Sequence, residues 1–290
     1  MKNKNIILAA VMAIAVSFTI TACNKNTSAE TGAAGKEQLS LYLTDGPGFF
    51  DNVYLDIRSV KVLVDTSSDT RRHDNDDWDR RGADDQRRDS SFVWENLNIK
   101  PGIYDILKFR NGADTLLAAS NITKGSIRLI KIEIGTNNSV VKDSVSYPVS
   151  LPANALNYIL IKLRGDECER YETGKKRLWI DFDVARSIFQ GNDNKFYIRP
   201  VFHFFVVNAS GQLSGRIRPG DAKGVVTAYN ATDTAYALTD REGFFKMRGL
   251  KEGNYSVYIN VSNGYQDTTI TNVKVQVPGE TNLGNIVLRK

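Results

Sequence analysis

The sequence predicts an all-β protein with two consecutive β-sandwich domains. Three observations support this fold class. Apolar and polar residues alternate along many short segments, helical periodicity is confined to residues 183–190, and Gly, Asn, Asp and Pro separate the segments. Alternation with a period of two is typical of a half-buried strand. Many such strands joined by short turns indicate a sandwich or a barrel.

The first domain is expected at residues 38–208. Its longest strand lies at 53–65, where the apolar positions change phase at Arg58-Ser59, which predicts a β-bulge. The other expected strands cover residues 38–45, 91–97, 103–112, 115–120, 127–135, 140–149, 158–165, 177–184 and 195–208.

Residues 65–91 interrupt this alternation with a segment of mixed charge, which predicts a long, exposed and mobile loop. Its acidic residues offer the oxygen ligands that calcium prefers, and the weak candidates are Asp74, Asp76, Asp77 and Asp79. An EF-hand loop starting at Asp74 would need Gly and Glu where Asp79 and Asp85 stand. We therefore interpret the segment as a solvated loop, with a calcium site as the alternative.

The second domain is expected at residues 209–290, with about seven short strands. Asp240 to Gly243 forms a predicted turn, in which the Asp carboxylate bonds to the backbone and the Gly takes a positive φ. Beyond it, Phe244 and Phe245 are expected on opposite faces of one strand.

The first 22 residues have the pattern of a secretory signal. Lys2 and Lys4 precede an almost wholly apolar run from Ile6 to Ile20. A transmembrane helix needs about 20 apolar residues, and this run is shorter. A positive start followed by a short apolar region is typical of a cleaved signal peptide.

The end of this signal, Ile20-Thr21-Ala22-Cys23, resembles the lipobox of bacterial lipoproteins. The resemblance implies cleavage before Cys23 and acylation of its thiol, which would anchor the chain to a membrane. Residues 23–37 have small and polar side chains, and a flexible tether of this length would span roughly 20 Å. In such lipoproteins an Asp after the cysteine favours the inner membrane, so Asn24 favours the outer membrane.

Two further resemblances concern the predicted domains. The segments Leu39–Val64, from Trp94 onward "WENLNIKPGIYDILKF", and from Leu178 onward "LWIDFDVARSIFQGNDNKFYIRPVFHFF" resemble the family named domain of unknown function 4382. This family implies a β-rich domain in the cell envelope, and it brings no assigned activity.

The segments Ser214–Ile217, Thr239–Phe245, Gly253–Val257 and Leu283–Leu288 resemble the carboxypeptidase regulatory-like family. That resemblance implies a transthyretin-like, carbohydrate-binding-like sandwich of seven strands. It carries no catalytic residues, because the module is an accessory to carboxypeptidases.

Composition excludes several functions. Without the two lysines of residues 1–22 the formal charge falls from +5 to +3, which gives no reason to expect nucleic acid as a partner. Zinc is disfavoured because His73 and His203 lie in no ligand spacing, and Cys168 is the one cysteine besides Cys23. No cofactor is expected, and no GxSxG motif indicates a nucleophile.

Two acids remain as a catalytic alternative. Asp181 and Asp183 share a predicted strand face about 7 Å apart, which lies within the range of glycosidase carboxylates. They also stand where a strand gives way to a helix start, so helix capping is the competing interpretation. Among the aromatic residues, Trp94 and Trp179 are expected in the core, Trp78 is expected to be exposed, and Tyr265 is expected to pack within its domain.

The resulting hypothesis is a lipid-anchored cell-envelope protein with a non-catalytic binding or scaffolding role. Its partner would be a carbohydrate or another envelope protein. The alternatives are an envelope hydrolase that uses Asp181 and Asp183, and a calcium-dependent adhesin that uses the charged loop.

Overall fold

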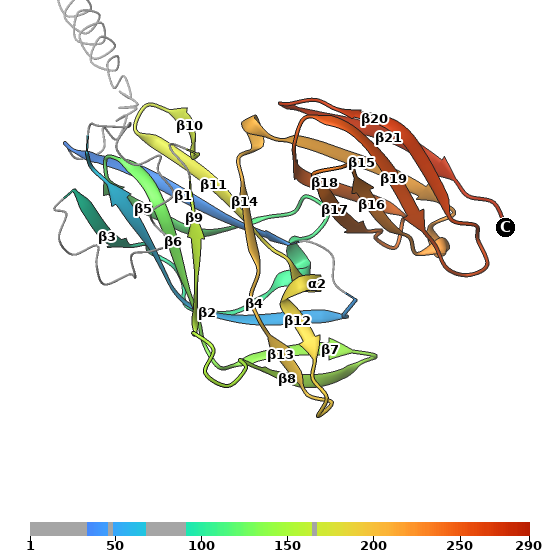
Figure 1. Ribbon diagram of the computed structural model, residues 1–290, viewed down its shortest axis with the longest axis horizontal. Coiled ribbons are helices and arrows are strands. Elements are labelled where there is room, and N and C mark those ends of the chain that lie inside the picture. The colour runs from blue at the N-terminus through green and yellow to red at the C-terminus, as the bar shows by residue number, and fades with distance from the viewer. Residues whose placement is uncertain (1–33, 46–48, 68–90, 164–166) are drawn as a thin grey trace, which may run out of the picture. The chain divides into compact units, whose positions relative to one another are not determined.

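The computed structural model is built almost entirely of β-strands (Figure 1), as the alternation predicts. It describes residues 34–45, 49–67, 91–163 and 167–290, which belong to one compact unit. The signal peptide, Cys23, Trp78 and the four weak calcium candidates lie outside the described residues. Among the residues that are described, no helix has the length and apolar character of a membrane-spanning segment.

Two sheets formed by residues 36–205 enclose the first hydrophobic core. The five-stranded sheet has the order β10 (Glu169–Glu172), β11 (Lys175–Phe182), β1 (Lys36–Asp45) and β5 (Thr115–Thr123), and β14 (Phe202–Phe205) also pairs with β11. The nine-stranded sheet has the order β12 (Ile188–Gln190), β13 (Phe196–Ile198), β8 (Val145–Ser150), β7 (Asn138–Lys142), β2 (Asn52–Asp65), β6 (Ser126–Ile134) and β9 (Tyr158–Lys162), while β3 (Phe92–Asn96) and β4 (Gly102–Asp105) pair with β2.

The long strand β2 contains the predicted irregularity. Its pairing with β6 changes register between Ile57 and Ser59. This change returns the apolar positions on both sides of the bulge to the same core, where all six are buried: Val53, Leu55, Ile57, Val60, Val62 and Val64. Burial of each such side chain stabilises the fold by about 1.5–3 kcal/mol, whereas a surface ion pair contributes about 0–1 kcal/mol.

Seven strands beyond residue 210 form two further sheets around a second core. One has the order β18 (Phe244–Leu250), β15 (Gly211–Arg218) and β21 (Gly279–Val287), and the other β17 (Thr234–Leu238), β16 (Val225–Tyr229), β19 (Gly253–Asn260) and β20 (Thr268–Val275).

The turn before β18 forms as predicted. The Asp240 carboxylate accepts backbone N–H bonds from Glu242 at 2.8 Å and Phe244 at 2.9 Å. Gly243 has φ +80°, and a Cβ there would lie 2.1 Å from the Ile217 carbonyl oxygen. This turn therefore requires glycine at position 243.

The helical segments are short: η3 (Ile106–Phe109), α2 (Val184–Ser187), η4 (Val207–Ala209) and η5 (Gly220–Ala222). The predicted strand at 103–112 was wrong beyond residue 105, where η3 begins. The predicted helix at 183–190 ends at Ser187 and continues as β12. The predicted strand at 195–208 divides at Pro200 into β13 and β14, which belong to different sheets, because proline has no N–H for the ladder.

One expectation about burial was wrong. Cys168, about which no burial was predicted, packs in the first core with 7% of its surface exposed. Trp94, expected in the core, is 37% exposed on β3, which pairs with β2 alone among the described strands. Trp179 is buried as predicted, and Tyr265 packs against the second core.

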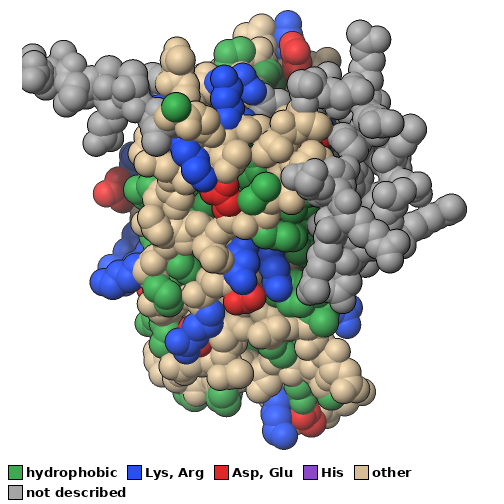
Figure 2. All heavy atoms as spheres, turned by 90° about the vertical axis from the view of Figure 1, so that its left-hand side faces the viewer, with side chains coloured by type: hydrophobic (Ala, Val, Ile, Leu, Met, Phe, Trp, Pro, Cys, Tyr) green, Lys and Arg blue, Asp and Glu red, His purple; other side chains and the backbone are tan. Residues whose placement is uncertain are grey.

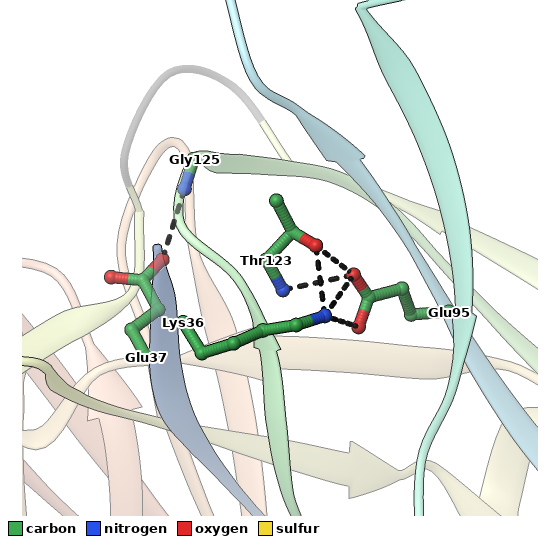
Figure 3. A network of polar contacts seen from close by, with 5 residues as sticks. All are labelled: Lys36, Glu37, Glu95, Thr123 and Gly125. Carbon is green, nitrogen blue, oxygen red and sulfur yellow. Dashed lines mark hydrogen bonds and ion pairs between the residues drawn. The ribbon is translucent and has the colours of Figure 1, made fainter. Parts of the chain in front are cut away.

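A buried ion pair joins β1 to β11. Lys176 Nζ lies 2.8 Å from Glu37 Oε1, and the two side chains are 1% and 6% exposed. Lys176 also donates to the Gly125 carbonyl at 2.5 Å. The Gly125 N–H donates to the Glu37 carboxylate at 3.2 Å (Figure 3). Nearby, Lys36 bridges Glu95 and Thr123, as Figure 3 shows. A second buried acid, Asp65, accepts two bonds from Arg128.

On the face shown in Figure 2, hydrophobic, basic and acidic side chains are scattered among the other side chains and the backbone. On that face the blue lysine and arginine side chains are spread apart and do not form one continuous basic patch.

The buried pair gives the first prediction. Lys176→Ala leaves the Glu37 carboxylate buried without its counter-charge, and we expect the free energy of unfolding to fall by about 3–5 kcal/mol. Lys195→Ala serves as the control, because Lys195 is exposed and lies 3.6 Å from Asp193, so its loss should cost less than about 1 kcal/mol. Urea denaturation measures both; equal losses in the two variants would contradict the assignment.

Candidate functional site

Two parallel strands bring acidic residues to one edge of the five-stranded sheet. β1 and β11 pair in parallel, with Thr44 opposite Asp181 and Asp45 opposite Phe182. Both strands end at this point, so Asp45 closes β1 and Asp183 follows β11. Carboxylates that are far apart in the sequence therefore meet at the carboxyl ends of neighbouring strands.

These acids line a cleft with a volume of about 330 Å³, which we call the acidic cleft. Asp45, Asp181, Asp183, Arg186 and His203 line it from the first pair of sheets. Charged residues of the second pair of sheets complete the lining: Asp233, Lys246, Arg248 and Lys251.

Asp45 is the unusual residue of this cleft. Its side chain is buried, with 7% exposed, and neither carboxylate oxygen has a hydrogen-bond partner within the described part of the chain. Burial raises its pKa well above the ordinary value of 3.8, and the nearby Asp181 carboxylate raises it further. The Arg110 guanidinium lowers it, but by less than burial and Asp181 raise it. The environment of Asp45 therefore opposes a negative charge on this carboxyl.

Asp183 has the opposite environment. Its carboxylate accepts the Arg186 N–H at 2.9 Å, which caps α2, and a second bond from the Arg186 side chain at 2.6 Å. His203 Nε2 lies 3.7 Å from the same carboxylate. Burial raises the pKa of Asp183, but the neighbouring His203 ring and the hydrogen bonds from Arg186 outweigh it and lower the pKa to about 2. The predicted capping role of Asp183 is confirmed.

Three of the charged groups on the opposite wall have partners outside this set of residues. Asp233 accepts a 2.6 Å bond from the Tyr255 hydroxyl. Lys246 donates to Glu280 at 2.7 Å, and Arg248 donates to Asp114 at 2.8 Å. Lys246 and Arg248 are thus already paired with acids other than Asp45.

The residues that form the first pair of sheets match one protein family. The family model described as Domain of unknown function (DUF4382) matches residues 36–200. The chain belongs to this family. The match confirms the resemblance drawn from the sequence, and it includes Asp45, Asp181 and Asp183 of the acidic cleft.

No curated protein matches this DUF4382 member. Among solved structures, a type II cohesin–X-dockerin complex from Acetivibrio cellulolyticus matches with 24% identity over 27% of this chain and 56% of that chain, with a TM-score of 0.22. A minor pilin of Streptococcus agalactiae matches with 15% identity over 88% of this chain and 96% of that one, with a TM-score of 0.21. A variant of the shaft pilin of Lactobacillus rhamnosus GG matches with 10% identity, 87% and 96% coverage and a TM-score of 0.26.

Sequence reasoning found part of the acidic cleft. It named Asp181 and Asp183, which both line the cleft. The two were predicted to share a strand face, but β11 ends at Phe182 and Asp183 caps α2 instead. His203 lies on β14, as its position between two phenylalanines predicts. Asp45 was missed, because the pairing of β1 with β11 joins segments about 135 residues apart. Its one local signal is an acid at the end of an apolar strand, before Gly-Pro-Gly.

The opposed pKa directions give the second prediction. The pKa of Asp45 in the folded protein is raised, so its ionisation destabilises the fold as the pH rises from 3.8 through that raised pKa. Asp45→Asn removes this effect, and we expect its stability relative to the unchanged protein to increase with pH over this window. Melting temperatures between pH 3.5 and 8 measure it.

Asp183→Asn is the control of opposite sign. The lowered pKa of Asp183 means that its stabilisation is present above pH 3.8 and is lost as the pH falls toward about 2. This variant should therefore be less stable than the unchanged protein at neutral pH. A constant stability difference across the pH range for Asp45→Asn would contradict the account of Asp45.

Proposed function

We propose that this DUF4382 member is a lipid-anchored protein of the cell envelope, with a non-catalytic binding or scaffolding role. The observation that carries the proposal is the position of Cys23, at the end of an apolar run that follows Lys2 and Lys4. Acylation there would hold the folded part at a membrane surface. Because β1 begins at Lys36, twelve residues would separate the acylated cysteine from the first strand. Asn24 favours the outer membrane as its location.

The proposal also covers the arrangement of the domains. Residues 38–208 would form the DUF4382 sandwich, and residues 209–290 a carboxypeptidase regulatory-like module. The seven strands from β15 to β21 support that second assignment, because a sandwich of seven strands is what the resemblance implies. Such a module would act by binding. The partner would be a carbohydrate or another envelope protein, held by surfaces such as the polar acidic cleft.

The third prediction tests the anchor. Cys23→Ser removes the thiol that acylation needs, so we expect no incorporation of a radiolabelled fatty acid and either a soluble protein or an uncleaved precursor. Cys168→Ser is the matched control, because the Cys168 thiol is buried in the first core and should not be acylated. Metabolic labelling followed by membrane fractionation measures both variants. Labelled Cys23→Ser protein would refute the anchor.

A second candidate function is supported by the carboxylates of the acidic cleft. The pKa of Asp45 is raised, and the pKa of Asp183 is lowered to about 2. Hydrolases that use two carboxylates often have one carboxyl group with a raised pKa and one that stays ionised. Asp181 lies in the same cleft.

The fourth prediction separates this hydrolase from the binding protein. We expect the purified mature protein to show no turnover on panels of glycans and peptides, because Asp183 is committed to Arg186 and to capping α2. Turnover that Asp181→Asn abolishes, and that the surface variant Asp193→Asn leaves unchanged, would establish the hydrolase instead.

A further inference from the structure

We propose that the acidic cleft binds a divalent cation of the calcium class through the carboxylates of Asp45 and Asp181. The first step is the state of Asp45. More than nine-tenths of its side chain is buried, and neither oxygen accepts a hydrogen bond from any described residue. Burying a carboxylate without a partner costs several kcal/mol, so such a group calls for a counter-charge.

The second step is the contrast with the other buried acids of the same fold. Glu37 is paired with Lys176 at 2.8 Å, and Asp65 with Arg128 at 2.9 Å. Asp56 is likewise paired with Arg58 at 2.7 Å. The fold thus supplies a cation to these carboxylates but no hydrogen-bonding cation to Asp45. A bound cation would supply the counter-charge that the nearby Arg110 guanidinium supplies only in part.

The side chains of the acidic cleft indicate which kind of cation it would bind. The acids of the cleft offer hard oxygen donors, and calcium takes six to eight oxygens that include water and backbone carbonyls. The His203 imidazole, which also lines the cleft, faces the Arg186 guanidinium at 2.7 Å and Asp183, which disfavours zinc. The small exposed fraction of Asp45 admits an ion more readily than a bulky organic ligand.

The fourth step concerns affinity. Among the described residues no three His, Cys, Asp or Glu side chains form a group that could hold a metal ion. Two carboxylates would therefore act together with water and backbone oxygens, and the cleft of about 330 Å³ has room for several waters at about 30 Å³ each. Few charged ligands give weak sites, and we expect a dissociation constant of about 10⁻⁴–10⁻³ M.

The fifth prediction uses terbium as the probe. Tryptophan-sensitised terbium luminescence should report binding to the mature protein, since Trp179 lies two residues before Asp181 on β11. Calcium should displace the terbium at millimolar concentration. Asp45→Asn should weaken binding at least about tenfold, by removal of one charged ligand. Asp233→Asn is the matched control, because Asp233 lines the same cleft but accepts a hydrogen bond from the Tyr255 hydroxyl. Terbium binding by this variant should be unchanged.

Further variants test whether the terbium is bound in the acidic cleft. Asp181→Asn should weaken binding as well, and it replaces Asp45→Asn if that variant fails to fold. Binding that survives in both variants but is lost in Asp76→Asn/Asp77→Asn would place the cation in the charged loop and overturn the proposal. No luminescence at millimolar terbium would overturn it too. Displacement of the terbium by butylammonium but not by calcium would assign the cleft to an organic cation instead and overturn the proposal.

Discussion

The parallel pairing of β1 with β11 is the constraint on which both polar features of the first sandwich depend. The register places Leu39 opposite Lys176 at one end and Thr44 opposite Asp181 at the other. Between these ends β1 buries Leu39, Leu41 and Leu43 completely, so neither strand can slide by one residue without turning these leucines out of the core. The hydrophobic contacts thus fix which charges meet. At the first end they bring Lys176 to Glu37, and at the second they bring Asp45 to Asp181.

The two ends differ in how their charge is balanced. A buried ion pair with good geometry roughly offsets its desolvation cost, which makes the Lys176–Glu37 end compatible with a stable core. At Asp45 the balance is different, because burial and the neighbouring Asp181 and Asp183 carboxylates outweigh the Arg110 guanidinium there. Proteins tolerate unbalanced buried charge mainly where it serves a function. The difference between the ends therefore distinguishes a structural pair from a candidate site within one pair of strands.

Local sequence patterns predicted the features that local physics determines. The bulge in β2 followed from one change of phase, and the Asp183 cap from an acid placed before a short helical segment. Trp94 was misjudged because burial depends on which strands become neighbours, and no local pattern encodes that. The same limit applies to Asp45, whose partner strand lies about 135 residues along the chain. Of the acidic cleft, sequence reasoning therefore identified the β11 side and missed the β1 side.

The commitment of Asp183 decides which chemistry the acidic cleft favours. A carboxylate that caps α2 and pairs with Arg186 stays ionised at any physiological pH, since its pKa is about 2. It can neither donate a proton nor leave its partners to attack a substrate without uncapping the helix. Its charge instead adds to the negative potential around Asp45, where Asp183 is among the groups that oppose ionisation. Acid–base catalysis needs two carboxylates that are free to change state, whereas cation binding needs negative potential and one or two open oxygens. The arrangement of the cleft meets the second requirement more closely than the first.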